Sequence, residues 1–203
     1  MPSHRKVSFA GVAGHLEGVL QLPANTPHAI AVVAHPLPIM GGTMDNKVVS
    51  TLARAFVELG YATLRFNFRG VGASDGSYDQ GNGETLDAIA AAEFMYEEFP
   101  DLPLLLAGFS FGAYVQARAA VELQPQQLVL IAPAVGRFAM PDVPHDTLLI
   151  HGDMDEVVEL HELLIWARPQ HLPVIVLAGA EHFFHGRLTQ LKQVVMRQLG
   201  AHL

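Results

Sequence analysis

The chain alternates between short runs rich in β-favouring apolar residues and longer segments whose apolar residues recur at helical spacing. Continuous apolar runs are typical of strands covered on both faces, as in parallel sheets. The runs lie at 30–34, 61–66, 104–107, 128–132, 148–151 and 174–177, and the helical segments at 48–59, 85–99, 113–123, 157–167 and 188–199. This alternation predicts one α/β domain over residues 1–203, with helices on both faces of a mostly parallel, doubly wound sheet.

The N-terminal segment from Lys6 to Leu22 follows a different pattern. Its apolar and polar residues partly alternate around Gly11 and Gly14. Such alternation, interrupted by glycines, indicates two short antiparallel strands joined by a turn. We therefore expect an antiparallel hairpin at one edge of the sheet.

Composition narrows the function classes. Half of the 203 residues are hydrophobic and 16% are charged, which is typical of a protein with a packed core. A net charge of −8 and the lack of any basic stretch argue against nucleic acid as a partner. No apolar run approaches the roughly 18 residues of a membrane span, and no secretory signal pattern is evident. With no cysteine for disulfides or thiolate chemistry, we expect a cytoplasmic protein without membrane insertion.

The pentapeptide Gly-Phe-Ser-Phe-Gly at residues 108–112 lies between a predicted strand and a predicted helix. This is the context of a nucleophile elbow, in which a sharp strand-to-helix turn exposes a serine at the end of a sheet. Its glycines suit a turn in which backbone segments approach closely. A glycine-rich turn with a helix-capping serine is the alternative for Ser110 if the pentapeptide is taken alone.

Acidic and histidine residues follow the last two predicted strands. Asp153 and Asp155 come after the strand at 148–151, and His182 and His185 come after the strand at 174–177. In parallel α/β sheets, ligands bind beyond the carboxyl ends of the strands, where these residues should meet Ser110. The sequence therefore provides a serine, an acid and a histidine for nucleophilic catalysis, with two candidates each for the acid and the base.

This order of Ser, Asp and His resembles that of the α/β-hydrolase superfamily, and the resemblance covers nearly the whole chain. Segments 35–38, 41–47 and 65–70 are similar to those of small, lidless bacterial α/β-hydrolases, and residues 69–74 are similar to the superfamily's R-G-x-G-x-S turn. The resemblance implies an α/β-hydrolase fold with Ser110 as nucleophile, Asp155 as acid and His182 as base. His182 directly follows the strand-end loop, whereas His185 is expected at the start of the last helix.

The tetrahedral intermediate of acyl transfer requires backbone N–H donors. One is expected to be the amide of Phe111, which immediately follows the nucleophile. The second is expected from the loop after strand 30–34, where Pro36 and Pro38 have no N–H group. Resemblance to the family's His-Gly-x segment implies Leu37, although Pro36 stands where that segment has glycine.

Only residues 133–146 separate the strand at 128–132 from the next, and three of these fourteen are prolines. Such a segment cannot build the lid domain that many relatives insert here. We therefore expect an open cleft for small or flexible acyl groups. Besides Leu37 and Phe111, its expected lining residues are Ile39, Met40, Phe109, Met154 and Phe183.

The resulting hypothesis is a serine hydrolase that cleaves carboxylic esters or thioesters of a small-molecule acyl substrate through an acyl-enzyme intermediate. A peptidase-like amide hydrolase and a non-catalytic binding protein are the alternatives. No cofactor is expected. His182 and His185 have ligand-like spacing, but no third converging ligand is apparent, so no metal is expected. Nothing in the sequence indicates an oligomeric state.

Overall fold

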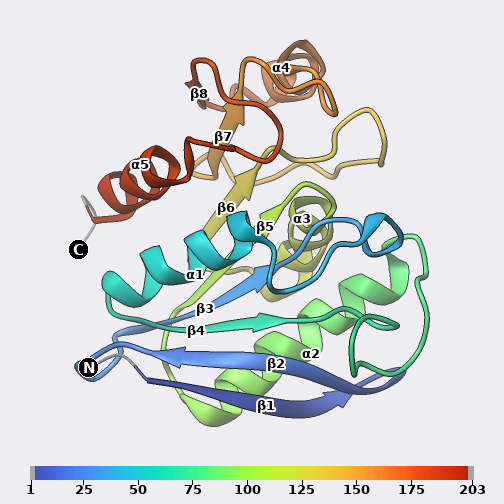
Figure 1. Ribbon diagram of the computed structural model, residues 1–203, viewed down its shortest axis with the longest axis vertical. Coiled ribbons are helices and arrows are strands. Elements are labelled where there is room, and N and C mark those ends of the chain that lie inside the picture. Colours follow the sequence, from blue (N-terminus) through green and yellow to red (C-terminus); the bar gives the residue numbers. More distant parts are fainter. Residues whose placement is uncertain (1–2, 201–203) are drawn as a thin grey trace.

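The computed structural model describes residues 3–200. Its strands form one sheet in the order β1-β2-β4-β3-β5-β6-β7-β8 (Figure 1). Strands β3 to β8 run parallel to one another, whereas β2 is antiparallel to both β1 and β4. The strands are β1 (Ser3–Gly11), β2 (Gly14–Leu22), β3 (Ala29–Ala34), β4 (Tyr61–Phe66), β5 (Leu104–Phe109), β6 (Gln127–Ile131), β7 (Leu148–Gly152) and β8 (Val174–Leu177).

Helices cover both faces of this sheet, which confirms the predicted α/β class and the α/β-hydrolase fold. Helices α1 and α5 pack together on one face, and α2 and α3 pack together on the other. The end of α4 contributes to the core on the α2 and α3 face. The helices are α1 (Lys47–Glu58), α2 (Asn82–Glu98), α3 (Phe111–Leu123), α4 (Leu160–Ala167) and α5 (Leu188–Gly200), with short 3₁₀ turns η1 (Pro38–Met40) and η2 (Arg168–Gln170).

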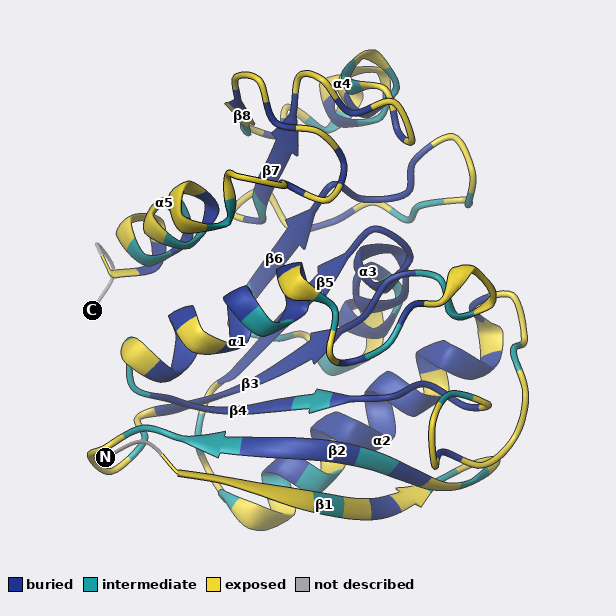
Figure 2. Ribbon diagram, in the orientation of Figure 1, coloured by how far each residue is buried: buried dark blue, intermediate teal, exposed yellow. Residues whose placement is uncertain are grey.

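The central strand β3 explains why the predicted runs are continuously apolar. All six of its residues are buried, and its side chains alternate between the two cores. Ile30 and Val32 belong to the core under α2 and α3, whereas Ala31 and Val33 belong to the core under α1 and α5. A strand buried on both faces needs no polar positions, as the dark central strands of Figure 2 show.

The N-terminal hairpin lies at the sheet edge, as predicted. β1 is mostly exposed, and its buried Phe9 stacks on Phe94 of α2 with the ring centroids 5.0 Å apart. β2 is more deeply buried because it also pairs with β4. The hairpin thus closes the sheet at the side away from β8.

The loop after β4 is fixed by a buried ion pair. The Arg69 guanidinium donates to the Asp87 carboxylate of α2 with a shortest distance of 2.7 Å, and the Arg69 backbone N–H donates to the same carboxylate at 2.9 Å. Ser74 Oγ donates to the Asn67 carbonyl at 2.8 Å. The R-G-x-G-x-S segment therefore shapes this loop, in agreement with its predicted place after the strand.

The connection between β6 and β7, residues 132–147, contains no helix and builds no lid, as expected from its length. Helix α4 begins at Leu160 rather than at the predicted residue 157, because residues 156–158 form a turn around the Asp155 carboxylate. Within residues 3–200, none of the helices has the length and apolar character that crossing a membrane requires.

Candidate active site

Ser110 lies at the turn between β5 and α3. Its backbone has φ 55° and ψ −116°, a sparsely populated conformation that costs about 1–3 kcal/mol for a residue with a side chain. The Ser110 N–H donates to the Ile131 carbonyl of β6 at 2.9 Å, and the Ser110 carbonyl accepts from Ala113 N–H at 3.0 Å. The turn is therefore held from both sides in the strained geometry of a nucleophile elbow.

The two glycines of the pentapeptide allow this close packing. A Cβ atom on Gly108 would lie 2.2 Å from the Gly112 carbonyl oxygen, and one on Gly112 would lie 2.4 Å from the Ala34 carbonyl oxygen. Neither position has room for a methyl group, because the obstructing atoms belong to the backbone. Helix α3 can thus start directly against the end of β3.

His182 and Asp155 complete a hydrogen-bonded chain with this serine. His182 Nε2 lies 3.0 Å from Ser110 Oγ, and His182 Nδ1 lies 2.7 Å from Asp155 Oδ2. Ser110 follows β5, Asp155 follows β7 and His182 follows β8, so the three side chains meet at the carboxyl edge of the sheet. This is the arrangement of a nucleophile, a base and an orienting acid.

Asp155 is held as a carboxylate although its side chain is fully buried. Burial opposes ionisation, but the hydrogen bonds from His182 and from the Val158 N–H outweigh it and keep the pKa of Asp155 below its ordinary value. Its Oδ1 accepts from the N–H groups of Val157 and Val158 at 2.9 and 2.8 Å, which leaves Oδ2 for His182. The acid is therefore both charged and fixed in direction.

A second buried histidine lies behind the acid. His151 Nε2 donates to the Val158 carbonyl at 2.8 Å and lies 3.5 Å from Asp155 Oδ2. Burial lowers the pKa of His151, with the hydrogen bond to Val158 and the charge of Asp155 opposing this shift. His151 therefore supports the turn that carries Asp155 as a neutral imidazole.

The alternative acid and base lie outside this chain. Asp153 is exposed, and its Oδ1 accepts from the Gly179 N–H at 2.5 Å. His185 is exposed and hydrogen-bonds to Glu181. It does not begin the last helix as expected, since α5 starts at Leu188.

The backbone N–H groups of Phe111, the first residue of α3, and of Leu37, in the loop after β3, make no hydrogen bond within residues 3–200. Both residues line the same cleft as Ser110. The structure thus brings the two expected oxyanion-hole donors to one cavity with the serine.

His35 fixes the orientation of the loop that carries Leu37. Its Nδ1 donates to the Pro36 carbonyl at 2.7 Å, and its Nε2 accepts from the Phe68 N–H at 3.1 Å. Burial lowers the pKa of His35 to about 4, so the ring is neutral at physiological pH. No peptide bond of the described chain is cis, so the Leu37 N–H points away from the anchored Pro36 carbonyl.

The cleft that contains Ser110 and His182 has a volume of about 260 Å³ and is lined mainly by apolar groups. Of the expected lining residues, Met40 and Phe183 lie in it. Phe109 does not: it is the last residue of β5, is fully buried, and packs against the His182 ring with centroids 5.0 Å apart. Ile39 and Met154 are exposed and do not line the cleft.

Several lining residues were not predicted. Ala134, Arg137 and Phe138 come from the connection after β6, and Val157 comes from the turn that holds Asp155. Their place after the carboxyl ends of β6 and β7 is the signal that could have identified them, because such loops surround the site in this kind of sheet.

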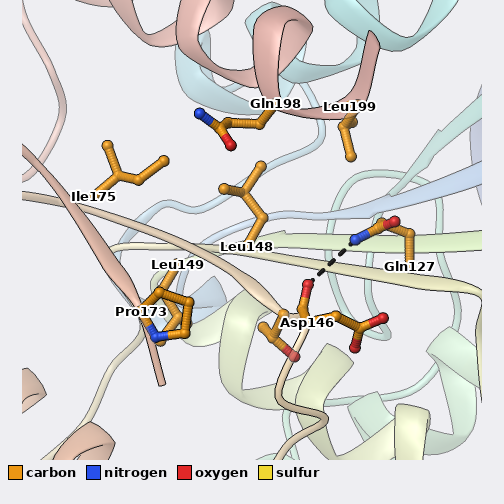
Figure 3. A pocket seen from close by; sticks show the side chains of 9 residues that line it. Gln127, Asp146, Leu148, Leu149, Pro173, Ile175, Gln198 and Leu199 are labelled. Carbon is orange, nitrogen blue, oxygen red and sulfur yellow. Dashed lines mark hydrogen bonds between the residues drawn. The ribbon is translucent and has the colours of Figure 1, made fainter. Parts of the chain in front are cut away.

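A different cavity, of about 250 Å³, lies at the amino ends of the parallel strands, opposite the ends at which Ser110 lies (Figure 3). It is formed by the first residues of β6 and β7, the segment entering β8 and the end of α5, with Gln127, Leu148 and Leu199 among its lining residues. The cleft at Ser110 lies at the carboxyl ends of the same strands, so the two cavities are separate. Residues 3–200 also contain no cluster of three or more potential metal ligands.

The fold and the assembled residues define the class of this protein as a serine hydrolase of the α/β-hydrolase fold. Residues 26–145 match the Hydrolase_4 family model, described as serine aminopeptidase, S33. This match covers more than half of the chain, and the protein therefore belongs to that family.

Solved structures support the same assignment. The chain is 40% identical to an α/β serine hydrolase without lid from Xanthomonas campestris, with a TM-score of 0.95 and coverage of 99% of this chain and 95% of that one. It is 39% identical to an α/β serine hydrolase homologue from Coxiella burnetii, with a TM-score of 0.88 and coverage of 96% and 97%. An uncharacterized protein from Rickettsia prowazekii (strain Madrid E) is 31% identical over 215 residues, which are 94% of this chain and 86% of that protein.

Proposed function

We propose that the protein hydrolyses carboxylic esters or thioesters of small or flexible acyl groups through an acyl-enzyme intermediate. The observation that carries this proposal is the hydrogen-bonded chain from Ser110 Oγ through His182 to Asp155, located at one end of an apolar cleft. Serine is a weak nucleophile at neutral pH, and an adjacent base is the usual means of activating it.

The first half of the reaction begins when Ser110 Oγ attacks the acyl carbonyl carbon while His182 Nε2 accepts the hydroxyl proton. His182 then delivers this proton to the leaving oxygen or sulfur as the tetrahedral intermediate collapses to an acyl-enzyme. Asp155 stabilises the imidazolium that exists between these steps. A water molecule, activated by His182, releases the acid in the second half of the reaction.

The negative oxygen of the intermediate is bound by the N–H groups of Phe111 and Leu37. Each such donor contributes about 3–4 kcal/mol to transition-state stabilisation in well-studied serine hydrolases. His35 is a positioning residue in this scheme, because it holds the Pro36 carbonyl and so fixes the peptide that carries the Leu37 N–H.

The volume and openness of the cleft support small or flexible acyl groups. A cavity of about 260 Å³ lies at the lower limit for drug-sized ligands. Met40 and Phe183 line the cleft and are exposed, so longer chains would extend into solvent across these side chains. We expect turnover to peak at short acyl chains and to fall as the chain lengthens.

The test is a panel of 4-nitrophenyl esters from acetate to decanoate, with wild type and Ser110→Ala compared under identical conditions. We expect wild type to hydrolyse the short esters and the variant to lose about 10⁴-fold or more in kcat. Equal activity of the two proteins would show that Ser110 is not the nucleophile. Inactivity of both would refute the ester assignment.

The same panel includes amino-acid 4-nitroanilides and acyl thioesters. The description of the family model makes amide cleavage the competing activity. The described chain has no lid or added domain to position a peptide, so we expect esters and thioesters to be cleaved and anilides to remain intact. Ser110-dependent cleavage of anilides at a comparable rate would replace the proposed function by that of an aminopeptidase.

A further inference from the structure

Arg137 is the only Lys, Arg, Asp or Glu side chain among the residues that line the Ser110 cleft. The other lining groups are apolar side chains, glycines, Asn46, and the catalytic pair of Ser110 and His182. Asn46 uses its side-chain oxygen to cap α1 by accepting from the Val48 N–H at 2.8 Å. A permanent positive charge in an otherwise apolar cleft thus requires its own explanation.

The position of the guanidinium is partly fixed. Arg137 Nε donates to the Val157 carbonyl at 3.1 Å, which ties the connection after β6 to the turn that carries Asp155. Arg137 makes no ion pair with any carboxylate in residues 3–200. Its two terminal nitrogens donate no hydrogen bond to any described residue, so the face of the guanidinium fork that suits a carboxylate or phosphate is available.

The overall charge of the protein makes this cation more distinctive. With a net charge of −8, the surface as a whole repels anions. Asp155, the acid nearest to the reacting groups, is buried beneath His182 and does not line the cleft. An anionic substrate would therefore find its only fixed positive partner in the cleft at Arg137.

We infer that Arg137 determines specificity for esters or thioesters that carry a negatively charged group, such as a carboxylate or phosphate, besides the bond that is cleaved. This inference rests on the proposed function and specifies its substrate class. The anion pairs with the Arg137 guanidinium at the mouth of the cleft, while the apolar part of the substrate lies against Phe138 and Phe183. The charge belongs either to the acyl part or to the leaving group.

The experiment compares matched pairs of substrates. One pair is 4-nitrophenyl hydrogen adipate and its neutral methyl ester, which place the charge on the acyl side. The other is the butyrate ester of 4-hydroxybenzoate and that of methyl 4-hydroxybenzoate, which place it on the leaving group. For each pair, the ratio of kcat/KM for the anionic ester to that for the neutral ester is measured in wild type, Arg137→Gln, Arg137→Lys and Arg197→Gln.

Arg197 is the matched control, because it is an exposed arginine of α5 that does not line the cleft. Its replacement by glutamine changes the net charge by the same amount. We expect the ratio for at least one pair to be about fivefold higher in wild type than in Arg137→Gln at low salt, near the upper limit for an exposed ion pair. Arg137→Lys should retain part of the preference, and Arg197→Gln should retain all of it.

The dependence of the preference on salt provides a second test. Raising the ionic strength from about 0.01 M to about 1 M shortens the screening length from roughly 30 Å to 3 Å. The anionic preference of wild type should decline toward that of Arg137→Gln, while the neutral partner shows no matching change. An arginine that only ties two loops together would lower the turnover of both members of a pair equally.

The inference is overturned if both ratios are the same in wild type and in Arg137→Gln while the esters are hydrolysed in a Ser110-dependent manner. That result would leave the proposed function intact. If no ester of either pair is hydrolysed in a Ser110-dependent manner, the proposed function fails and this inference fails with it. The two failures are thus distinguished by the neutral esters.

Discussion

At the scale of single residues, the site depends on one buried carboxylate that orients one imidazole. Asp155 uses one oxygen to hold its own turn and the other to bind His182. The amide of an asparagine has the same shape, but its NH₂ group cannot accept a hydrogen bond from His182 Nδ1–H, and its neutral oxygen stabilises an imidazolium poorly. The tautomer needed to accept the serine proton is then no longer favoured.

The predicted consequence is that Asp155→Asn lowers kcat by about 10²–10⁴-fold on a short ester, with a much smaller change in KM. Steady-state kinetics on 4-nitrophenyl butyrate measures this effect. Asp153→Asn is the matched control from the same loop, since the asparagine oxygen can still accept from the Gly179 N–H. Equal losses in both variants would contradict the assignment of the acid.

His35 gives a prediction about stability and pH. Its pKa is lowered to about 4 in the folded protein, whereas an unfolded histidine has a pKa near 6.5. Between these values the unfolded chain binds a proton that the folded protein does not, so stability falls as pH decreases from 6.5 toward 4. We expect His35 to lower the free energy of unfolding by about 2 kcal/mol between pH 7 and pH 5.

Urea denaturation of wild type and His35→Asn at both pH values measures this loss of unfolding free energy. The asparagine amide can still donate to the Pro36 carbonyl, but it does not titrate. The variant should therefore show a smaller loss of stability at pH 5, whatever its stability at pH 7. Titration of the wild-type His35 ring above pH 6 in an NMR experiment would refute the explanation.

The residues predicted from sequence are those whose chemistry is coupled to a local backbone pattern. Ser110 lies within a pentapeptide that requires a particular turn, and Asp155 and His182 follow recognisable strands. Arg137 has no such pattern around it, because it lies in an irregular connection whose path depends on a contact with Val157. A single side chain of that kind becomes visible only once the fold brings the two loops together.

At the scale of elements, the elbow depends on the close approach of α3 to β3. Gly112→Ala would place a methyl group 2.4 Å from the Ala34 carbonyl oxygen and 2.6 Å from that of His35, the residue before the Pro36–Leu37 peptide. Relieving this clash requires a shift of backbone, which moves Ser110 relative to the proposed oxyanion donors. Overpacking of this kind costs about 1–3 kcal/mol or more.

We therefore expect Gly112→Ala to lower the free energy of unfolding by at least about 2 kcal/mol and kcat/KM by about 100-fold. Gly200→Ala is the control, since a Cβ atom there would lie 3.7 Å from its nearest neighbour in the described chain, Leu59, and alanine favours helices. It should leave both quantities unchanged or raise stability slightly. Chemical denaturation measures the free energy of unfolding of the two variants, and ester kinetics measures their kcat/KM. Equal losses in Gly112→Ala and Gly200→Ala would contradict the proposed clash at Gly112.

The differences between predicted and observed elements have local causes. Strand β5 extends to Phe109, two residues beyond the predicted run, so Phe109 follows strand alternation into the same core as Ala107 instead of entering the cleft. Helix α4 starts later than predicted because the Val157 and Val158 N–H groups donate hydrogen bonds to the Asp155 carboxylate. Apolar patterns predict which elements form, but such tertiary hydrogen bonds decide where each one ends.

At the scale of the whole molecule, the absence of a lid in the described chain leaves the cleft open without a conformational change. Residues 132–147 connect β6 directly to β7 and contribute Ala134, Arg137 and Phe138 to the cleft wall. The topology of the sheet brings loops from distant parts of the sequence to one edge, which allows a chain of this size to assemble the site.

An open cleft predicts simple saturation kinetics on water-insoluble esters. Enzymes whose lids open at a lipid surface show a sharp rise in rate above the solubility limit of the substrate. Here the rate should follow a hyperbola through that limit, without such a rise. Titration of tributyrin hydrolysis with a pH-stat measures it, and a steep increase once droplets form would indicate a covering element over the cleft.

Covalent labelling of the nucleophile tests most directly whether Ser110 is the reacting residue. A fluorophosphonate phosphonylates an activated serine at neutral pH with loss of fluoride, and intact-protein mass spectrometry followed by peptide mapping locates the added group. We expect one added group per chain, located on Ser110, in wild type, none in Ser110→Ala, and strongly slowed labelling in His182→Ala. Labelling of a different residue, or labelling of wild type and Ser110→Ala alike, would contradict it.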